Sequence, residues 1–241
     1  MGSGDDGSGF YGVTLLRRED AGGGLSRVTI DPGESLALSY TDPGQYVEVR
    51  AAGEAGYFVL ASEPRTRPWQ LIMRAGGGVS DVLLVASPGD PLDITRAIGS
   101  GFPLREARGR HLIVAVGGTG VAAALPILRH RMRDGDERLT TILIGLRNED
   151  EIPIQGELEA WAGAGVDVVV CLSQGPRAPA SGKVRLGRGY IQDILRELAA
   201  AERYALRGSL VFAVGPTSMV TSLRDLAPEL GIAAGDVVTN H

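Results

Sequence analysis

The chain contains 241 residues with a formal net charge of −5, and 44% of them are hydrophobic, so it can bury one large core or two modest ones, and we expect two. The acidic balance and the lack of any block of lysine or arginine leave no electrostatic footprint for a nucleic-acid backbone, so we expect no nucleic-acid partner. No apolar run approaches the roughly 20 residues that cross a bilayer, and the first residues resemble no secretory signal; we therefore expect a cytoplasmic protein with no membrane contact. One cysteine, Cys171, excludes disulfides within the chain and an iron–sulfur cluster held by this chain alone.

Short β-type segments fill the N-terminal part of the chain. They combine β-branched residues with partial alternation of apolar and polar side chains, and turn-forming triplets such as Asp31-Pro32-Gly33 separate them. The segments are residues 12–16, 26–30, 35–40, 45–50, 57–62, 69–74 and 91–98. Many short strands at this spacing favour a small antiparallel β-barrel. The preceding residues are glycine, serine and aspartate with one methionine, and we expect a disordered tail at 1–9.

The C-terminal part changes to an alternation of strands and helices. We predict strands at 111–116, 141–146, 166–171 and 209–214, and helices at 119–133, 155–164, 189–203 and 216–229. Such alternation predicts a parallel sheet with helices on both faces, an α/β nucleotide-binding domain. The stretch from Gly101-Phe102-Pro103 to Gly109 is the natural junction, so we expect domains at 10–106 and 107–241.

A glycine turn follows the first strand of the second domain. Residues 118–123, GTGVAA, fit the pattern G-x-G-x-x-G/A at the point where a buried strand passes into a helix. Glycines there let the backbone approach a diphosphate, and the amides at the helix start favour its negative charge. A tight strand-to-helix turn also needs glycine for purely steric reasons, so both interpretations stay open. The acidic residue that usually closes the second strand is absent, since Leu146-Arg147-Asn148 stands there.

Several further motifs occur in one order along the chain. They are Pro43-Gly44-Gln45-Tyr46-Val47, residues 56–62 (GYFVLAS), 76–81 (GGGVSD), 99–104 (GSGFPL), Gly118-Thr119-Gly120, Gly145-Leu146-Arg147, residues 189–193 (GYIQD) and 215–219 (GPTSM). In this order they resemble the ferredoxin-NADP reductase superfamily, and within it the electron-transfer subunits of dihydroorotate dehydrogenases and the gamma subunits of some hydrogenases. The resemblance runs from about residue 12 to the end.

The resemblance implies an N-terminal barrel that binds FAD and a C-terminal domain that binds a nicotinamide nucleotide. It implies hydride transfer from NADH to FAD in the cleft between the domains, followed by electron transfer to a partner. Residues matched to the flavin site are Tyr57, Phe58, Val59, Leu60, Ala61, Ser62, Met73, Arg74, Gly77, Gly78, Val79 and Ser80. Residues matched to the nucleotide site are Gly118, Thr119, Gly120, Arg147, Ser173, Gly215, Pro216 and Met219. No catalytic residue is assigned.

This chain departs from the family pattern in the flavin motif and in the nicotinamide motif. The family's flavin motif has an arginine for the diphosphate and a hydroxyl for the ring, where this chain has Gly56 and Val59. Phe58 keeps the stacking side chain, but loss of the charged contact weakens binding by about 1.5 to 3 kcal/mol. Val214 replaces a cysteine that lies against the nicotinamide in the family, and we expect slower turnover from that change.

Cofactor choice and partners also follow from the resemblance. NADP-selective members place Ser-Arg after the third strand, whereas this chain has Ser173-Gln174-Gly175-Pro176-Arg177, so we expect NADH to be preferred over NADPH. The chain has no C-terminal cysteine cluster, so electrons pass directly to an electron-accepting protein, a larger enzyme subunit or a small acceptor, and a homodimer stays open. Two alternatives remain: a redox-inactive scaffold or accessory subunit of another enzyme, and an enzyme that uses the cleft for non-redox work.

The remaining chemistry-bearing residues favour ordinary structural roles. We expect residues 129–133 (RHRMR) to form a solvated helix face, with a docking surface for an acidic partner as the alternative. Residues 149–151, all acidic, are expected to form a charged loop. The three histidines have no metal-ligand spacing, so no metal site is expected, and His241 is expected to fray, with a cover over the flavin as the alternative.

Overall fold

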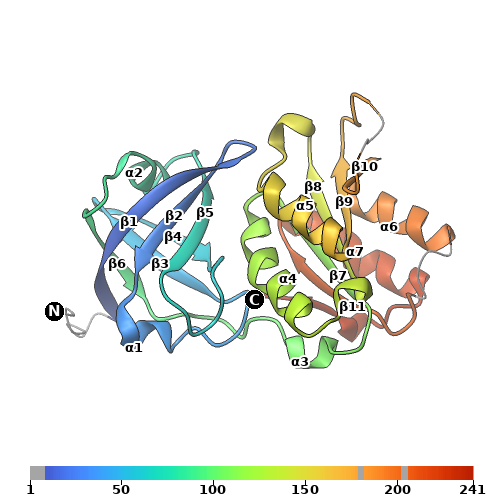
Figure 1. The fold of residues 1–241 in the computed structure, drawn as a ribbon, viewed down its shortest axis with the longest axis horizontal. Helices are drawn as coiled ribbons and strands as arrows, with labels where there is room; N and C mark the ends of the chain where they lie inside the picture. Colours follow the sequence, from blue (N-terminus) through green and yellow to red (C-terminus); the bar gives the residue numbers. More distant parts are fainter. Residues whose placement is uncertain (1–8, 179–181, 202–205, 241) are drawn as a thin grey trace. The chain divides into compact units, whose positions relative to one another are not determined.

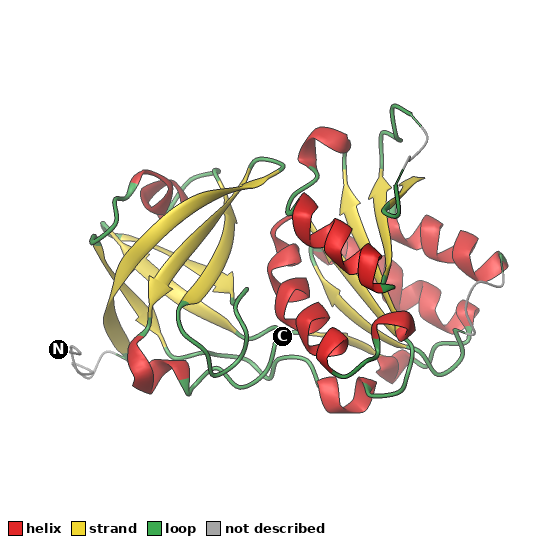
Figure 2. Cartoon of the chain, viewed as in Figure 1, coloured by secondary structure: helices red, strands yellow, loops and turns green. Residues whose placement is uncertain are grey.

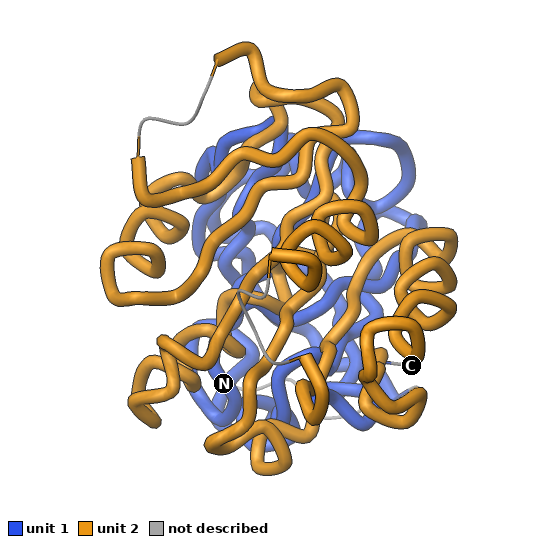
Figure 3. The backbone as a smooth tube through the Cα atoms, turned by 90° about the vertical axis from the view of Figure 1, so that its right-hand side faces the viewer, with its two compact units in different colours: residues 1–102, 240–241 blue, residues 103–239 orange. Residues whose placement is uncertain are grey.

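The computed structural model describes residues 9–178, 182–201 and 206–240. The chain divides into two compact units, residues 1–102 with 240–241 and residues 103–239, which are coloured separately in Figure 3. This division falls after Phe102, inside the predicted junction 101–109 and four residues before the predicted domain boundary. The expected disordered tail, apart from Gly9, lies outside the described residues. Within the described part of the chain, no helix is long and apolar enough to cross a membrane.

Unit 1 is built on an antiparallel sheet with the strand order β4-β3-β6-β1-β2-β5 (Figure 1). Its strands are β1 (Phe10–Gly22), β2 (Leu25–Asp31), β3 (Tyr46–Ala51), β4 (Glu54–Val59), β5 (Trp69–Arg74) and β6 (Pro91–Thr95). A bridge between Leu60 and Leu71 joins the two end strands, and this closure makes the sheet the barrel that the sequence predicted. Two short helices accompany it, α1 (Gly33–Ala37) and α2 (Val79–Val85).

The barrel interior explains why one predicted strand is wrong. Residues 35–40 were expected to extend, but Gly33–Ala37 is the helix α1. Leu36 and Tyr40 are four residues apart and both buried, whereas Leu38 between them is 62% exposed, which is the periodicity of a helical turn. Tyr40 then packs edge-on against Trp69, with ring centroids 6.2 Å apart, so helical packing into the core overrides the β-type composition.

Unit 2 contains a parallel sheet with the strand order β10-β9-β8-β7-β11-β12, drawn in yellow in Figure 2. Its strands are β7 (Leu112–Gly117), β8 (Thr140–Leu146), β9 (Asp167–Leu172), β10 (Arg185–Arg188), β11 (Leu210–Val214) and β12 (Val237–Thr239). Its α-helices are α3 (Leu104–Ala107), α4 (Val121–Arg133), α5 (Gln155–Ala164), α6 (Ile191–Ala200) and α7 (Thr217–Leu226), and its 3₁₀ turns are η1 (Gly118–Gly120), η2 (Glu137–Leu139), η3 (Glu149–Glu151), η4 (Ala227–Leu230) and η5 (Ala234–Asp236).

Helices cover both faces of this sheet. Apolar residues of α6 and α7 pack against alternate residues of the central strands, including Ile113, Leu143 and Val211, while α4 and α5 lie over the other face (Figure 1). Because both faces are covered, the strands are apolar throughout, and all six residues of β7 are buried. The four predicted strands are present; the short edge strands β10 and β12 were not predicted.

Arg131 in unit 2 is buried, contrary to the prediction from the sequence. It was expected on a solvated helix face, but its side chain is 1% exposed. Its guanidinium donates hydrogen bonds to the backbone oxygens of Ala107, Arg110 and Leu139 and pairs with the Asp136 carboxylate at 2.8 Å. These loop carbonyls lie beside the end of α4 and need donors, and a five-donor guanidinium supplies them. The predicted solvated face therefore does not include this residue.

Candidate functional site

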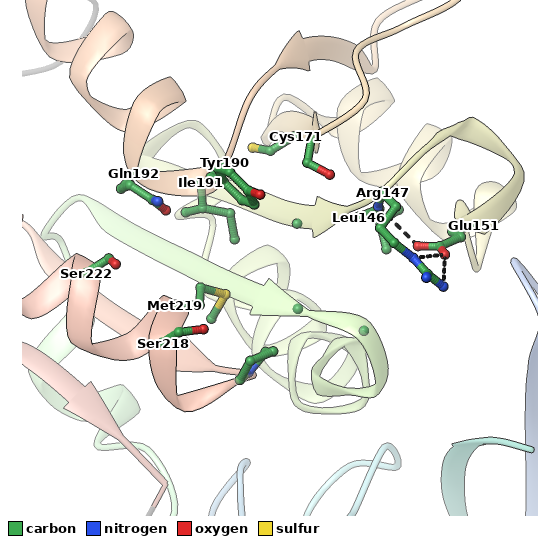
Figure 4. Close-up of a pocket in the computed structure, with 15 residues that line it drawn as sticks. Leu146, Arg147, Glu151, Cys171, Tyr190, Ile191, Gln192, Ser218, Met219 and Ser222 are labelled. Carbon is green, nitrogen blue, oxygen red and sulfur yellow. Dashed lines mark hydrogen bonds and ion pairs between the residues drawn. The ribbon is translucent and has the colours of Figure 1, made fainter. Parts of the chain in front are cut away.

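A cavity of about 470 Å³ opens in unit 2 at the carboxyl ends of strands β7, β8, β9 and β11 (Figure 4). Its walls come from the turns that follow these strands and from the first residues of α6 and α7. The lining residues are Gly117, Gly118, Gly145, Leu146, Arg147, Glu151, Cys171, Ser173, Tyr190, Ile191, Gln192, Pro216, Ser218, Met219 and Ser222. In open α/β sheets ligands bind at this edge, because the strand ends and helix starts leave a crevice there.

The glycine turn between β7 and α4 shows both features expected of it, the steric need for glycine and the room for a ligand, each at a different glycine. A Cβ on Gly120 would lie 2.4 Å from the Val214 carbonyl oxygen, so glycine is required there for close packing. Gly118 has φ +56°, and a Cβ on it would meet nothing within 4 Å, although Gly118 lines the cavity. The missing side chain at Gly118 therefore leaves room for a ligand beside the backbone.

The turn between β11 and α7 packs directly against the glycine turn. A Cβ on Gly117 would lie 3.0 Å from Pro216 Cδ, and a Cβ on Gly215 would lie 2.7 Å from Met219 Cε. The two turns therefore form one continuous wall, with Pro216 and Met219 on the cavity side. Val214, which stands in place of the family's cysteine, is not among the lining residues.

The cavity has two charged lining residues among those described, and they neutralise each other. The Glu151 carboxylate accepts from the Arg147 guanidinium at 2.6 and 2.7 Å and from the Arg147 backbone N–H at 3.1 Å, as the dashed lines in Figure 4 show. Arg147 is 73% exposed at its side chain, and Glu151 is 16% exposed. The lining is therefore close to neutral.

The acidic turn η3 also engages the arginine that was predicted to be displaced from the third strand. Asp150 pairs with the Arg177 guanidinium, and Glu149 accepts from the Arg177 backbone N–H. These contacts raise the pKa of Arg177. Arg177 does not line the cavity, so the loop after β9 brings no free guanidinium into it through this residue.

Two lining side chains on β9 and α6 differ strongly in accessibility. Cys171 is fully buried, and burial raises the pKa of its thiol to about 12, so it lies under the cavity floor as an inert thiol. Tyr190 at the start of α6 is 62% exposed and presents its ring at the opening. Among the described residues, no three histidine, cysteine or acidic side chains are placed to hold a metal ion.

The structure brings together five of the eight residues matched to the nucleotide site: Gly118, Arg147, Ser173, Pro216 and Met219. Thr119 is exposed beside them, whereas Gly120 and Gly215 serve packing. Lining residues outside the predicted set include Glu151, Tyr190, Gln192, Ser218 and Ser222. Ser218 and Ser222 are four residues apart on α7, so helical periodicity was the signal that could have paired them.

The residues matched to the flavin site divide into two groups on the barrel. Leu60, Ala61, Ser62, Met73 and Val79 are buried, and their side chains serve the core. The others, Tyr57, Phe58, Val59, Arg74, Gly77, Gly78 and Ser80, are half-buried or exposed. Phe58 packs against the barrel core beside Val47, so the side chain expected to stack on a flavin faces inward.

Aromatic rings instead occupy the outer face of β3 and β4. Tyr57 is 67% exposed, and its ring meets that of Tyr46 edge-on at 5.9 Å. Its hydroxyl donates to Glu48 Oε2 at 3.2 Å, and the charge of Glu48 raises the pKa of Tyr57. Val59 lies directly opposite Tyr46 in the β3–β4 register. Tyr46 belongs to the quoted motif at 43–47, and strand alternation places it on this face.

The glycine-rich segment before α2 already binds an anion from its own chain. The Asp81 carboxylate accepts from the backbone N–H groups of Gly76 and Gly77, both at 3.0 Å. A Cβ on either glycine would meet nothing within 4 Å. Two amides thus converge on one negative group in an open position, and a phosphate oxygen fits the place of that carboxylate.

The position of the family's flavin-motif arginine is closed in this barrel. A Cβ on Gly56 would lie 2.9 Å from Val79 Cγ1, so no larger residue fits without movement of Val79. At the other end of the chain, His241 lies outside the described residues, and Asn240 is buried in unit 1, where its amide donates to the Gly44 carbonyl at 3.1 Å.

Comparison with known proteins agrees with this architecture. Residues 114–225 match the family of oxidoreductase NAD-binding domains. The chain is 25% identical over 236 residues to the fruit protein pKIWI502 of Actinidia deliciosa, covering 90% of this chain and 72% of that protein. It is 23% identical over 194 residues to the dihydroorotate dehydrogenase B (NAD(+)) electron transfer subunit of a Geobacillus species, covering 78% of this chain and 68% of that one.

A solved structure shows the fold. A ferredoxin NADP+ reductase from Neisseria gonorrhoeae with bound FAD and NADP superposes with a TM-score of 0.79 over 96% of this chain and 98% of that one, at 16% identity. Some other curated relatives are matched over 63 to 66% of their own length. Residues 114–225 thus match oxidoreductase NAD-binding domains, and the chain has, over nearly its whole length, the two-domain fold of a ferredoxin NADP+ reductase, which agrees with the predicted resemblance.

Proposed function

We propose that this chain is an NADH-dependent oxidoreductase that passes electrons through FAD to a partner protein or to a small acceptor. The observation that carries the proposal is the cavity of unit 2, which lies at the carboxyl ends of parallel strands and has the open glycine Gly118 in its wall. Its volume of about 470 Å³ falls within the range of roughly 300 to 1,000 Å³ that is common for cofactor sites.

The lining residues divide into groups suited to the parts of a nicotinamide nucleotide. Gly118 lets a diphosphate approach the backbone, because no side chain stands in the way. The hydroxyl groups of Ser173 and Ser218 are donors and acceptors for ribose and phosphate oxygens. Pro216 and Met219 offer an apolar wall for an aromatic ring. The exposed ring of Tyr190 can pack against a base.

The charge of the lining supports NADH over NADPH. A 2′-phosphate adds close to two negative charges, which are usually held by a free guanidinium. Here Arg147 is engaged by Glu151, and Arg177 is engaged by Asp150 outside the lining. A nucleotide without the extra phosphate therefore suits the cavity better.

FAD is the proposed carrier, held by the barrel of unit 1. When bound, it supplies the conversion of a two-electron hydride into electrons that leave singly or in pairs. The amides of Gly76 and Gly77 would hold its diphosphate once the Asp81 carboxylate has left them. Tyr57 and Tyr46 provide aromatic surface for the ring. Val59 offers no hydroxyl, and no arginine stands at position 56, so we expect weaker flavin binding than the family motif gives.

A partner protein is the proposed electron acceptor. The Geobacillus relative is named as an electron transfer subunit, which supports this proposal. The cytoplasmic location and a homodimer stay predictions.

A redox-inactive scaffold is the second candidate. The Asp81 contacts and the Gly56–Val79 packing favour it, because both reduce the expected affinity of the barrel for a flavin.

The test begins with the visible spectrum of the full chain, purified without added cofactor and again after incubation with FAD and desalting. Anaerobic NADH is then added. We expect flavin absorbance that bleaches with NADH, and more slowly with NADPH. A chain that stays colourless after reconstitution would refute the reductase proposal and leave the scaffold.

A second measurement tests nucleotide binding in the cavity independently of flavin binding in the barrel. NAD⁺ binding is measured by calorimetry for wild type, Gly118→Ala and Gly109→Ala. Both glycines have positive φ, +56° and +67°, and open Cβ positions, so each variant pays a similar strain of about 1 kcal/mol. Only Gly118 lines the cavity, and we expect weaker binding from that variant alone. Equal affinities for all three proteins would place the nucleotide elsewhere.

A further inference from the structure

Glu151 stands out because it lies in the cavity wall without belonging to the predicted site. It follows β8 on the turn η3, five residues after Leu146. The acidic residue that usually ends the second strand of a dinucleotide-binding fold is missing from the sequence at 146–148. The turn η3 returns a carboxylate to the same strand end, where it lines the cavity (Figure 4).

Arg147 makes three contacts with the Glu151 side chain. One carboxylate oxygen accepts from Nε and Nη2 of Arg147, and the other accepts from the Arg147 backbone N–H. A carboxylate has about four acceptor positions, so it can accept from more than one donor at once. Glu151 is 16% exposed at its side chain and Arg147 is 73% exposed, so the carboxylate lies in the wall while the guanidinium reaches solvent.

We propose that Glu151 makes this cavity selective for nicotinamide nucleotides that lack a 2′-phosphate. It does so in two ways. Its carboxylate pairs with the guanidinium of Arg147 and so competes with a phosphate for that group, and its negative charge repels a phosphate dianion. A free 2′-hydroxyl can donate to the carboxylate, whereas a 2′-phosphate dianion in its place cannot. The inference rests on the proposed binding of a nicotinamide nucleotide in this cavity.

The neighbouring contacts of η3 support the same assignment. Asn148 donates to Gln174 Oε1 at 3.3 Å, which links the loop after β8 to the loop after β9. Asp150 holds Arg177 from the same turn. The acidic turn therefore engages two arginines near the strand ends, and of these Arg147 alone lines the cavity. Removing the Glu151 charge frees that guanidinium for an anion.

The experiment measures NAD⁺ and NADP⁺ binding to the full chain by calorimetry for wild type and Glu151→Gln. Glutamine keeps the size of the side chain and an oxygen acceptor for the Arg147 backbone N–H, so the loop can keep its turn. We expect the preference for NAD⁺ over NADP⁺ to fall about tenfold or more, the value of one charge-assisted contact to phosphate. Glu229→Gln, which breaks an exposed contact with Arg196 outside the cavity, is the matched control and should leave the preference unchanged.

A double variant separates charge selection from a loop effect. In an Arg147→Ala background the guanidinium is gone, so most of the gain in NADP⁺ affinity from Glu151→Gln should disappear. An unchanged preference in Glu151→Gln, with NAD⁺ still bound, would overturn the inference and leave the proposed function intact. A wild type that prefers NADP⁺ would also overturn it. A wild type that binds neither nucleotide would refute the proposed function itself.

Discussion

Replacing Arg131 with methionine tests whether this buried cation organises the loops of unit 2. Methionine keeps an unbranched chain of similar length but removes every donor. The backbone oxygens of Ala107, Arg110 and Leu139 lose their guanidinium partner, and Asp136 loses its ion-pair partner. Removing one member of a buried pair costs about 3 to 5 kcal/mol. We expect unit 2 to lose stability of about 4 kcal/mol, within that range.

The two tryptophans allow this loss to be measured in the right unit. Trp69 lies in unit 1 and Trp161 in unit 2, both buried, so Trp161 is the fluorescent reporter of unit 2 in a Trp69→Phe background. With a urea slope of about 2 kcal/mol per molar, the midpoint should fall by about 2 M. The control Arg133→Met changes an exposed arginine of the same helix and should stay within about 0.5 kcal/mol. Equal midpoints for both variants would refute the structural role.

Three further predictions address packing, cofactor and pH. Gly120→Ala places a Cβ 2.4 Å from the Val214 carbonyl oxygen and should destabilise unit 2 by about 1 to 3 kcal/mol, read as a lower urea midpoint of Trp161; an unchanged midpoint would contradict the packing role. Asp81→Ala frees two amides and removes a negative charge, so FAD affinity in a fluorescence titration should rise about tenfold, whereas lower affinity would place the diphosphate elsewhere. Burial and the charge of Arg131 hold the pKa of His111 below its usual 6.5. The unfolded chain therefore binds more protons than the folded one below about pH 6.5, and the free energy of unfolding should fall as the pH drops through that range. An equal fall in the variant His111→Asn would exclude His111 as the cause.

The sequence predicted the framework of unit 2 because its strands are buried on both faces. Six consecutive apolar residues mark β7, and the helix predicted at 155–164 matches α5 residue for residue. The edge strand β10 was missed, since its four residues RLGR have no β-type pattern and extend by pairing with β9. Pairing with a neighbour, unlike burial, leaves little trace in local sequence.

The candidate site was predicted where a residue follows directly from a strand end. Gly118, Arg147 and Ser173 were found in this way, and all three line the cavity. Glu151 was missed because its carboxylate reaches the cavity only after a 3₁₀ turn folds back onto Arg147. Arg131 was misplaced because its acceptors, among them Ala107 and Leu139, approach it only when the segments before β7 and after α4 fold back onto the helix end. Contacts that depend on loop conformation have no periodicity to detect.

The glycine at position 56 is part of the packing of the barrel, and this affects how its difference from the family's flavin motif is interpreted. Gly56 is the position where the family has an arginine, and Val79 fills the space that a side chain at 56 would need. An arginine restored at 56 alone would therefore collide with Val79 instead of reaching a diphosphate. Val79 is 2% exposed, so the space beside Gly56 is filled by a core side chain. For the proposed FAD site we therefore expect affinity to depend mainly on the amides of Gly76 and Gly77, which the Asp81 carboxylate of the same chain now engages.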